Sequence, residues 1–145
     1  MGSISTISPP IRSLFLLCLP DLSGQTVHLS DFRGDQTLVL FWRPSCGFCQ
    51  RMLSDLKAWE AQPPEGAPQL LVVSTDSIQD NQAMELRSPI VLDHAGMSIG
   101  SQFSATGTPM AVLVDAEGRI ASELAAGAPA VLALAGHQQE KTAPA

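Results

Sequence analysis

Basic residues are scarce in this sequence. Eight Lys and Arg stand against 14 Asp and Glu, which gives a net charge of −6. The basic residues are scattered along the chain, so they form no run that could follow a nucleic acid backbone. We therefore expect no nucleic acid partner.

Long apolar runs are also missing. No stretch approaches the ~20 consecutive apolar residues that would span a bilayer. The N-terminus has no basic start, and its leucine-rich run ends in Pro20-Asp21 without a small-residue cleavage site, so it does not resemble a signal peptide. Met1-Gly2-Ser3 is typical of a cloning remnant, which makes residues 1–13 an extension that need not be native.

Cysteine is the third scarce residue. Three cysteines are too few for a disulfide-stapled scaffold. A chain of 145 residues with 45% hydrophobic residues can bury a core without such bridges. We expect one domain over residues 14–136, followed by a flexible tail over residues 137–145.

The hydrophobic pattern predicts a layered α/β domain. Residues 14–19 and 26–29 read as an N-terminal β-hairpin, in which Cys18 is expected to be a small buried hydrophobe. Residues 37–42 are apolar on both faces, which predicts a central strand covered on both sides. A helix is predicted over residues 46–60, with Ser45 as its N-cap. Further strands are predicted over residues 69–74 and 89–92 and as a hairpin of 110–114 with 119–123, and further helices over 76–86, 97–103 and 128–135.

Cys46 and Cys49 form a C-x-x-C pair between the predicted central strand and the predicted helix. Cys46 lies in the first turn of that helix, where unpaired N–H groups and the helix dipole stabilise a thiolate. Cys49 lies one turn further on, within reach of a disulfide to Cys46. The spacing and the position therefore favour a redox-active pair.

Two metal-based alternatives lack the residues that they require. Covalent haem attachment needs a histidine after Cys49, where Gln50 stands. Structural zinc needs about four ligands. Only one further cysteine and three histidines remain, without a second closely spaced pair: Cys18, His28, His94 and His137. We expect no metal, and a purely structural cysteine pair stays as the other alternative.

Three segments carry a resemblance to a known family. Residues 40–49, Leu-Phe-Trp-Arg-Pro-Ser-Cys-Gly-Phe-Cys, resemble the active-site segment of thioredoxins. Residues 19–34 resemble the N-terminal segment of membrane-tethered thioredoxin-like thiol-disulfide oxidoreductases and of peroxiredoxins. Gly107-Thr108-Pro109 and the hairpin after it resemble the segment that holds the cis-proline of that superfamily. The resemblance implies a thioredoxin fold, with a central mixed β-sheet flanked by helices and an N-terminal β-hairpin.

The resemblance also implies roles for individual residues. Cys46 and Cys49 are the expected catalytic residues. Pro109 is expected to be cis and to pack against the disulfide, while the backbone of Thr108 pairs with an extended substrate segment. The expected substrate-binding residues are Trp42, Gly47, Phe48, Thr108 and Pro109.

The same resemblance implies a partner class and a location. The substrates are expected to be protein disulfides or dithiols, without a metal or an organic cofactor. We expect a redox partner that resets the Cys46–Cys49 pair. The resemblance implies that this partner is a membrane protein and that the setting is extracytoplasmic.

Departures from the family pattern bear on the mechanism. Leu40 stands where thioredoxins commonly carry a buried aspartate, and Met52 stands where the tethered reductases carry a glutamate. Arg43 stands where peroxiredoxins place a threonine, three residues before the reactive cysteine. The leading hypothesis is thus a thiol-disulfide oxidoreductase. The alternatives are a non-catalytic binding module that uses the Thr108-Pro109 surface and, with less support, a peroxiredoxin-type peroxidase.

Overall fold

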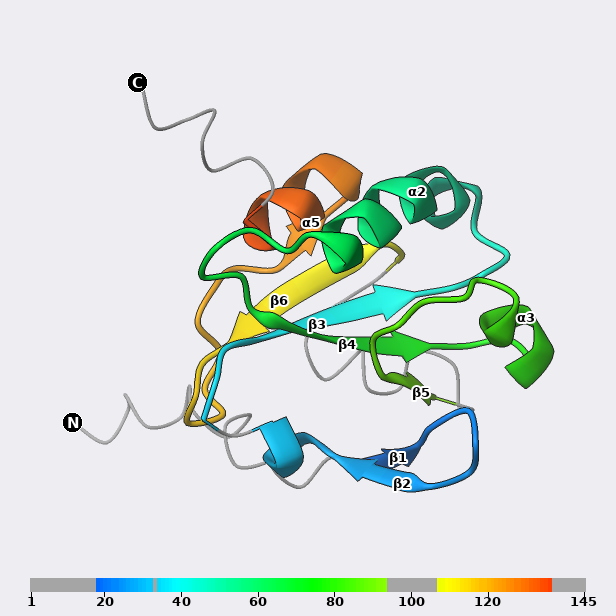
Figure 1. The fold of residues 1–145 in the computed structure, drawn as a ribbon, viewed down its shortest axis with the longest axis horizontal. Coiled ribbons are helices and arrows are strands. Elements are labelled where there is room, and N and C mark those ends of the chain that lie inside the picture. Colours follow the sequence, from blue (N-terminus) through cyan, green and yellow to red (C-terminus); the bar gives the residue numbers. More distant parts are fainter. Residues whose placement is uncertain (1–17, 33, 94–106, 137–145) are drawn as a thin grey trace.

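A five-stranded mixed sheet forms the centre of the molecule (Figure 1). The structure is a computed structural model that describes residues 18–32, 34–93 and 107–136. The sheet has the order β5-β4-β3-β6-β7, in which β3, β4 and β5 are parallel and β6 and β7 are antiparallel to their neighbours. Its strands are β3 (Thr37–Trp42), β4 (Gln69–Ser74), β5 (Ile90–Leu92), β6 (Met110–Val114) and β7 (Ala125–Ala126).

Strand β3 is the central strand that the sequence predicts. All six of its residues are buried. Because successive side chains of a strand point to opposite faces, Leu40 and Trp42 enter the core on one face of the sheet, and Val39 and Phe41 enter the core on the other. Side chains therefore cover this strand on both faces.

Two helices cover one face of the sheet, α2 (Gly47–Ala61) and α5 (Ala128–Leu134) (Figure 1). Helix α2 buries residues at three- and four-residue spacing, which is the pattern of an amphipathic helix. The indole N–H of Trp59 donates a hydrogen bond of 2.9 Å to the carbonyl oxygen of Ala135, which ties the end of α2 to the end of α5. Both helices lie where the sequence predicts them.

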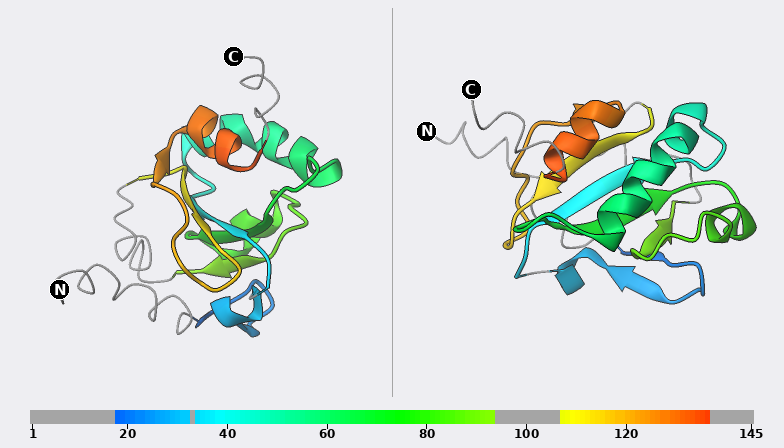
Figure 2. Two further views of the ribbon diagram at one scale, coloured as in Figure 1. Left: turned by 90° about the vertical axis from the view of Figure 1, so that its left-hand side faces the viewer. Right: turned by 45° about the horizontal axis from the view of Figure 1, so that its top comes forward.

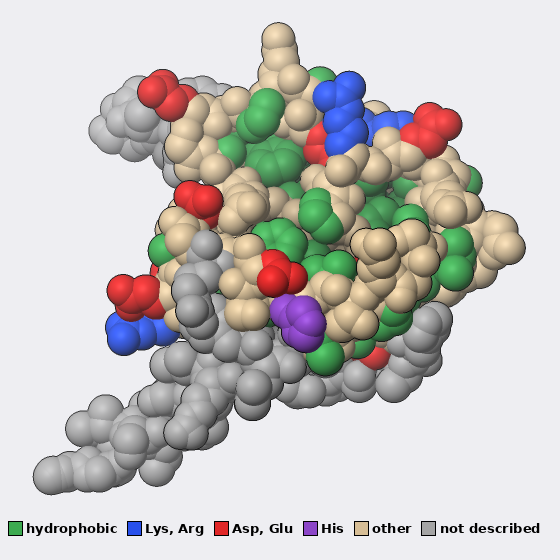
Figure 3. Space-filling view, turned by 60° about the horizontal axis from the view of Figure 1, so that its bottom comes forward, with side chains coloured by type: hydrophobic (Ala, Val, Ile, Leu, Met, Phe, Trp, Pro, Cys, Tyr) green, Lys and Arg blue, Asp and Glu red, His purple; other side chains and the backbone are tan. Residues whose placement is uncertain are grey.

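The opposite face is covered by the predicted N-terminal hairpin, β1 (Cys18–Pro20) with β2 (Thr26–His28), and the short 3-10 helix η2 (Leu29–Phe32) that follows it (Figure 2). Leu19, Val27 and Leu29 pack against the sheet there. Figure 3 shows this side of the molecule, where the basic side chains lie near the edges of the view, beside acidic side chains. Residues 14–17 of the predicted first strand lie outside the described residues.

The expectation that Cys18 is buried is wrong. Its side chain is exposed. Cys18 and His28 are paired residues of the hairpin. Strand periodicity turns Leu19 toward the sheet, so the neighbouring Cys18 points away from it.

Two predicted elements are shorter than expected. Helix α3 spans only Ile78–Gln82. It starts after Ser77, because Asp76 has a left-handed φ of 70° and Ser77 caps the helix by accepting the Asp80 N–H. The second strand of the predicted hairpin, over residues 119–123, is reduced to a single bridge between Ile120 and Val114 of β6. The hydroxyl of Ser122 accepts the Leu113 N–H in place of a backbone partner, and β7 begins further on. The predicted helix over residues 97–103 and the predicted tail over 137–145 lie outside the described residues.

Candidate functional site

Three segments meet at one end of the sheet. Strands β3 and β4 are parallel and aligned at Trp42 and Ser74, so the chain leaves both strands at the same edge. Strand β6 is antiparallel to β3 and pairs Met110 with Phe41, which brings the start of β6 to that edge too. The register therefore places the C-x-x-C segment beside residues 75–77 and 107–109.

A tight turn connects β3 to α2. The Arg43 carbonyl oxygen accepts the backbone N–H of Cys46 at 2.9 Å, and Cys46 is the N-cap residue of the helix. The prediction of Ser45 as N-cap is wrong by one residue. The Ser45 backbone N–H donates instead to the carboxylate of Asp76 at 3.1 Å, so Ser45 belongs to the turn. Cys46 thus stands directly before the free N–H groups of the first helical turn.

The Cys46 thiol is half-buried and lies against the proline loop. It donates a hydrogen bond of 3.5 Å to the carbonyl oxygen of Thr108. Desolvation raises the pKa of Cys46, but hydrogen bonds to its thiolate from the Thr108 side chain and from the backbone N–H groups of Cys49 and Phe48 outweigh it. The net result is a pKa below the ordinary value, so this sulfur is suited to be a nucleophile.

Cys49 has the opposite environment. It is fully buried, one turn along the same helix, and burial is the largest of the causes that raise the pKa of its thiol to about 11. A backbone hydrogen bond from Arg43 and one from the Thr108 side chain lower the pKa by less, and the charge of Cys46 raises it. The two sulfurs are not bonded to each other.

The core around Cys49 is apolar at the positions where the resembled families carry acids. Leu40 and Met52 are buried in the same cluster as Cys49, with 0% and 1% of their surface exposed. Neither side chain can accept the Cys49 proton.

Trp42, one of the expected substrate-binding residues, is buried. Only 1% of its surface is exposed, because it ends the central strand with its ring turned into the core. Its indole N–H donates to the sulfur of Met84 at 2.9 Å. Trp42 therefore packs beneath the site rather than on its surface.

The other expected substrate-binding residues surround Cys46. Gly47 and Phe48 are exposed, and Phe48 keeps 65% of its surface open although the Arg51 guanidinium lies 5.3 Å from its ring centre. Thr108 is half-buried, Pro109 is buried, and the peptide bond between them is cis.

Sequence reasoning missed two contributions to this site. It assigned a role only to the backbone of Thr108, whereas the Thr108 side chain also lowers the pKa of both cysteines. A hydroxyl residue directly before the proline was the signal available. It also missed the contact of Asp76 with the cysteine turn, which joins residues 31 positions apart and has no local pattern.

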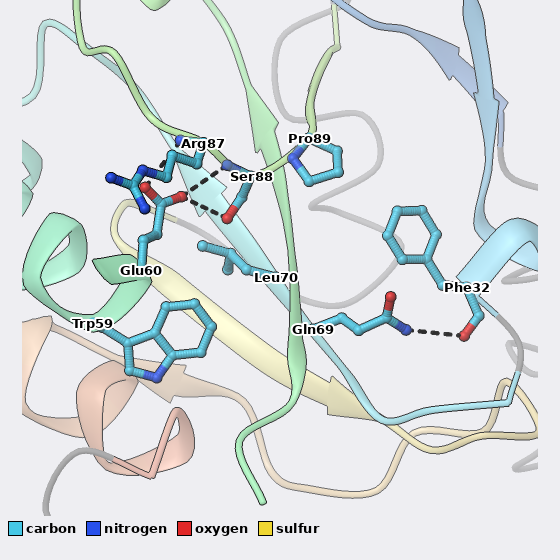
Figure 4. Close-up of a pocket in the computed structure, with 8 residues that line it drawn as sticks. All are labelled: Phe32, Trp59, Glu60, Gln69, Leu70, Arg87, Ser88 and Pro89. Atoms are coloured by element: carbon cyan, nitrogen blue, oxygen red, sulfur yellow. Dashed lines mark hydrogen bonds between the residues drawn. The ribbon is translucent and has the colours of Figure 1, made fainter. Parts of the chain in front are cut away.

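Glu60, the nearest acid on the same helix after Asp55, does not serve the cysteines. Glu60 is 11 residues beyond Cys49, about 16 Å along the helix axis. Figure 4 shows its carboxylate at an open pocket, where it accepts the backbone N–H groups of Arg87 and Ser88 at 2.9 and 2.8 Å, and also the Ser88 hydroxyl. The pocket is lined by Phe32, Trp59, Glu60, Gln69, Leu70, Arg87, Ser88 and Pro89. These bonds fix the loop before β5.

Comparison with protein families decides the classification. The model of the AhpC/TSA family matches residues 14–140, which is most of the chain. The chain belongs to the AhpC/TSA family. No curated protein matches it in sequence.

Several solved structures have a similar fold. The thioredoxin domain of a thiol-disulfide oxidoreductase from Bacteroides vulgatus is 28% identical, with a TM-score of 0.60 over 74% of this chain and 81% of that one. A secreted Mycobacterium tuberculosis disulfide oxidoreductase homologous to Escherichia coli DsbE is 19% identical, with a TM-score of 0.69 over 86% and 96%. StoA from Bacillus subtilis is 20% identical, with a TM-score of 0.66 over 85% and 96%.

These comparisons confirm the expected thioredoxin fold, and the family match agrees with the expected relation to peroxiredoxins. The family match, over residues 14–140, covers the sheet, helices α2 and α5 and the N-terminal hairpin. In the part of the chain that the structure describes, no helix combines the length and the apolar character needed to cross a bilayer.

Proposed function

We propose that this AhpC/TSA protein is a protein thiol-disulfide oxidoreductase that uses Cys46 as nucleophile and Cys49 as resolving thiol. One observation supports this assignment above the others. At the start of α2, the pKa of Cys46 is lowered, and one turn further along the pKa of Cys49 is raised to about 11. The thiolate of Cys46 therefore forms more readily than that of Cys49, which stays protonated at neutral pH.

The reaction proceeds in two exchange steps. The Cys46 thiolate attacks one sulfur of a substrate disulfide, forms a mixed disulfide and releases the other substrate sulfur as a thiolate. Cys49 then loses its proton and attacks the Cys46 sulfur, which releases the second substrate thiolate and leaves a Cys46–Cys49 disulfide. Two electrons pass from the cysteine pair to the substrate, and the reverse sequence oxidises a substrate dithiol.

The surface around Cys46 suits an extended protein segment. The exposed ring of Phe48 and the backbone of Gly47 border the nucleophile on one side. Thr108 and Pro109 border it on the other side, where under this proposal the backbone of Thr108 pairs with substrate. Under this proposal the ring of Phe48 contacts the side chain next to the substrate cysteine.

The proposed cycle needs a redox partner but no resident metal or organic cofactor. A partner protein must return the Cys46–Cys49 pair to its starting state after each turnover. The resemblance of residues 19–34 to membrane-tethered oxidoreductases supports a membrane protein as that partner, in an extracytoplasmic compartment.

Reduction of insulin disulfides by dithiothreitol tests the proposal. We expect the protein to accelerate the reaction above the rate of dithiothreitol alone, and Cys46→Ser to abolish the acceleration. A binding module that only holds a partner on the Thr108-Pro109 surface would give no rate above buffer. That result would overturn the oxidoreductase assignment.

A further inference from the structure

The loop after β4 holds the cysteine turn from outside. Asp76 accepts the backbone N–H of Ser45, the residue directly before the nucleophile, at 3.1 Å. The Arg43 side chain also donates from Nε to the hydroxyl of Thr75 at 3.4 Å. Residues 43–45 are therefore linked to residues 75–76 at two points.

A buried amide fixes that loop in turn. Asn81 of α3 has none of its surface exposed, and its side-chain NH2 group donates to the carbonyl oxygens of Thr75 and Ser77, each at 2.8 Å. Its side-chain oxygen accepts the hydroxyl of Ser74. The two bonded carbonyls belong to the residues on either side of Asp76.

The backbone of Asp76 depends on this support. Its φ of 70° lies in the left-handed region, which asparagine and aspartate tolerate better than most residues and which glycine adopts freely. In this conformation the loop turns back toward the cysteine turn, and the carboxylate reaches the Ser45 N–H. The left-handed backbone of Asp76 and its carboxylate oxygen thus together make the contact with the Ser45 N–H.

We infer that Asp76, held by Asn81, is a positioning residue that fixes the turn before Cys46 for attack on a disulfide. The Asp76 oxygen occupies the Ser45 N–H, and the Arg43 carbonyl occupies the Cys46 N–H. The N–H groups of Phe48 and Cys49 then stay directed at the Cys46 sulfur. This inference rests on the proposed function, but its test does not require turnover.

Two substitutions separate the hydrogen bond from the backbone conformation and from the charge. Asp76→Asn keeps a left-handed residue and an acceptor oxygen but removes the charge. Asp76→Gly keeps the conformation but removes the acceptor. Glu85→Gly is the matched control. Among the described residues, Glu85 and Asp76 are the two that have a positive φ without being glycine, and Glu85, with a φ of 57°, is exposed.

The readouts are hydrogen exchange of the Ser45 amide and the rate at which iodoacetamide alkylates Cys46 at pH 7. Loss of a hydrogen bond to a charged group should speed Ser45 exchange about tenfold in Asp76→Gly. A smaller fraction of Cys46 thiolate in Asp76→Gly should slow alkylation by about fivefold. Asp76→Asn and Glu85→Gly should stay within about twofold of the parent protein for both measurements.

Three results would overturn the inference. Asp76→Gly could match the parent, Asp76→Asn could be as slow as Asp76→Gly, or Glu85→Gly could show the same loss. Circular dichroism of each variant confirms that it is folded. If the parent fails to reduce insulin, the proposed function fails, whereas the exchange and alkylation results still decide whether Asp76 positions the turn.

Discussion

Cys46 and Cys49 lie one helical turn apart, yet their surroundings differ in almost every physical respect. Cys46 stands at the N-cap of α2, half-buried beside exposed Phe48. Cys49 faces the core, with Leu40 and Met52 in the same cluster. The first sulfur receives hydrogen bonds that stabilise its anion, whereas burial disfavours the anion of the second.

The difference shows how one helix can hold two thiols with separate tasks. The helix start supplies N–H groups and access to solvent, which a nucleophile needs. The inner face of the helix buries the second thiol, so this thiol stays protonated at neutral pH. The contrast comes from position on the helix, not from the chemistry of the residue.

The largest expected effect is an all-or-none difference in trapping. Cys49→Ser should accumulate a mixed disulfide through Cys46, because no second thiol can resolve it. Cys46→Ser should accumulate none, because Cys49 is buried and protonated. Both variants are incubated with a disulfide substrate and separated on non-reducing gels. A mixed disulfide on Cys49 in the Cys46→Ser protein would reverse the assignment of the two roles.

A base beside Cys49 should reduce the difference between the two cysteines. In the parent, resolution of a preformed Cys46 mixed disulfide should rise about tenfold per pH unit from pH 6 to 9, because the Cys49 pKa of about 11 lies above this range. Leu40→Asp supplies a carboxylate and should speed resolution about 100-fold at pH 6, flattening the profile.

The same substitution should lower the free energy of unfolding, because the carboxylate loses its hydration in an apolar strand. Leu40→Asn is the matched control, since it removes the leucine without adding a base. Identical pH profiles in the parent and Leu40→Asp would show that another group already takes the Cys49 proton.

Thr108→Val should change both cysteines in the same direction. The Thr108 side chain lowers the pKa of each thiol, so an isosteric residue without a hydroxyl should raise the pKa of both. Alkylation of Cys46 at pH 7 should slow by about threefold to tenfold. An unchanged rate would show that the backbone N–H groups alone stabilise the thiolate.

Cys46 should show no special reactivity toward hydrogen peroxide. Arg43 stands three residues before Cys46, where a peroxiredoxin-type site carries threonine, and its Nε atom points to Thr75. Peroxide should oxidise Cys46 no faster than an ordinary thiolate of the same pKa. Stopped-flow kinetics provides the rate, and a value several orders of magnitude higher would favour the peroxidase alternative.

Strong local patterns made most of the fold predictable. The apolar run of β3 and the spacing of buried residues along α2 each determine one element, and both elements lie as predicted. The C-x-x-C pair identified the site because a strand-to-helix junction gives its first sulfur a defined environment. The sequence also showed that no acid stands at positions 40 and 52.

Features that depend on tertiary contacts were not predictable. The exposure of Cys18 depends on which side of the hairpin faces the sheet. The burial of Trp42 depends on how the end of β3 enters the core, and the reach of Asp76 to Ser45 depends on the register of β3 with β4. Hydrophobic periodicity contains no information about contacts of this kind.

Site-resolved alkylation of the reduced protein tests the central contrast most directly. Iodoacetamide is applied from pH 5 to 10, and mass spectrometry reports the labelled fraction of Cys46 and of Cys49. Because its pKa is lowered, Cys46 should keep its reactivity as the pH falls below the ~8.5 of a free thiol and lose it only below its own pKa. Cys49 should stay unlabelled through the neutral range. Equal labelling of both cysteines at pH 7 would contradict the account.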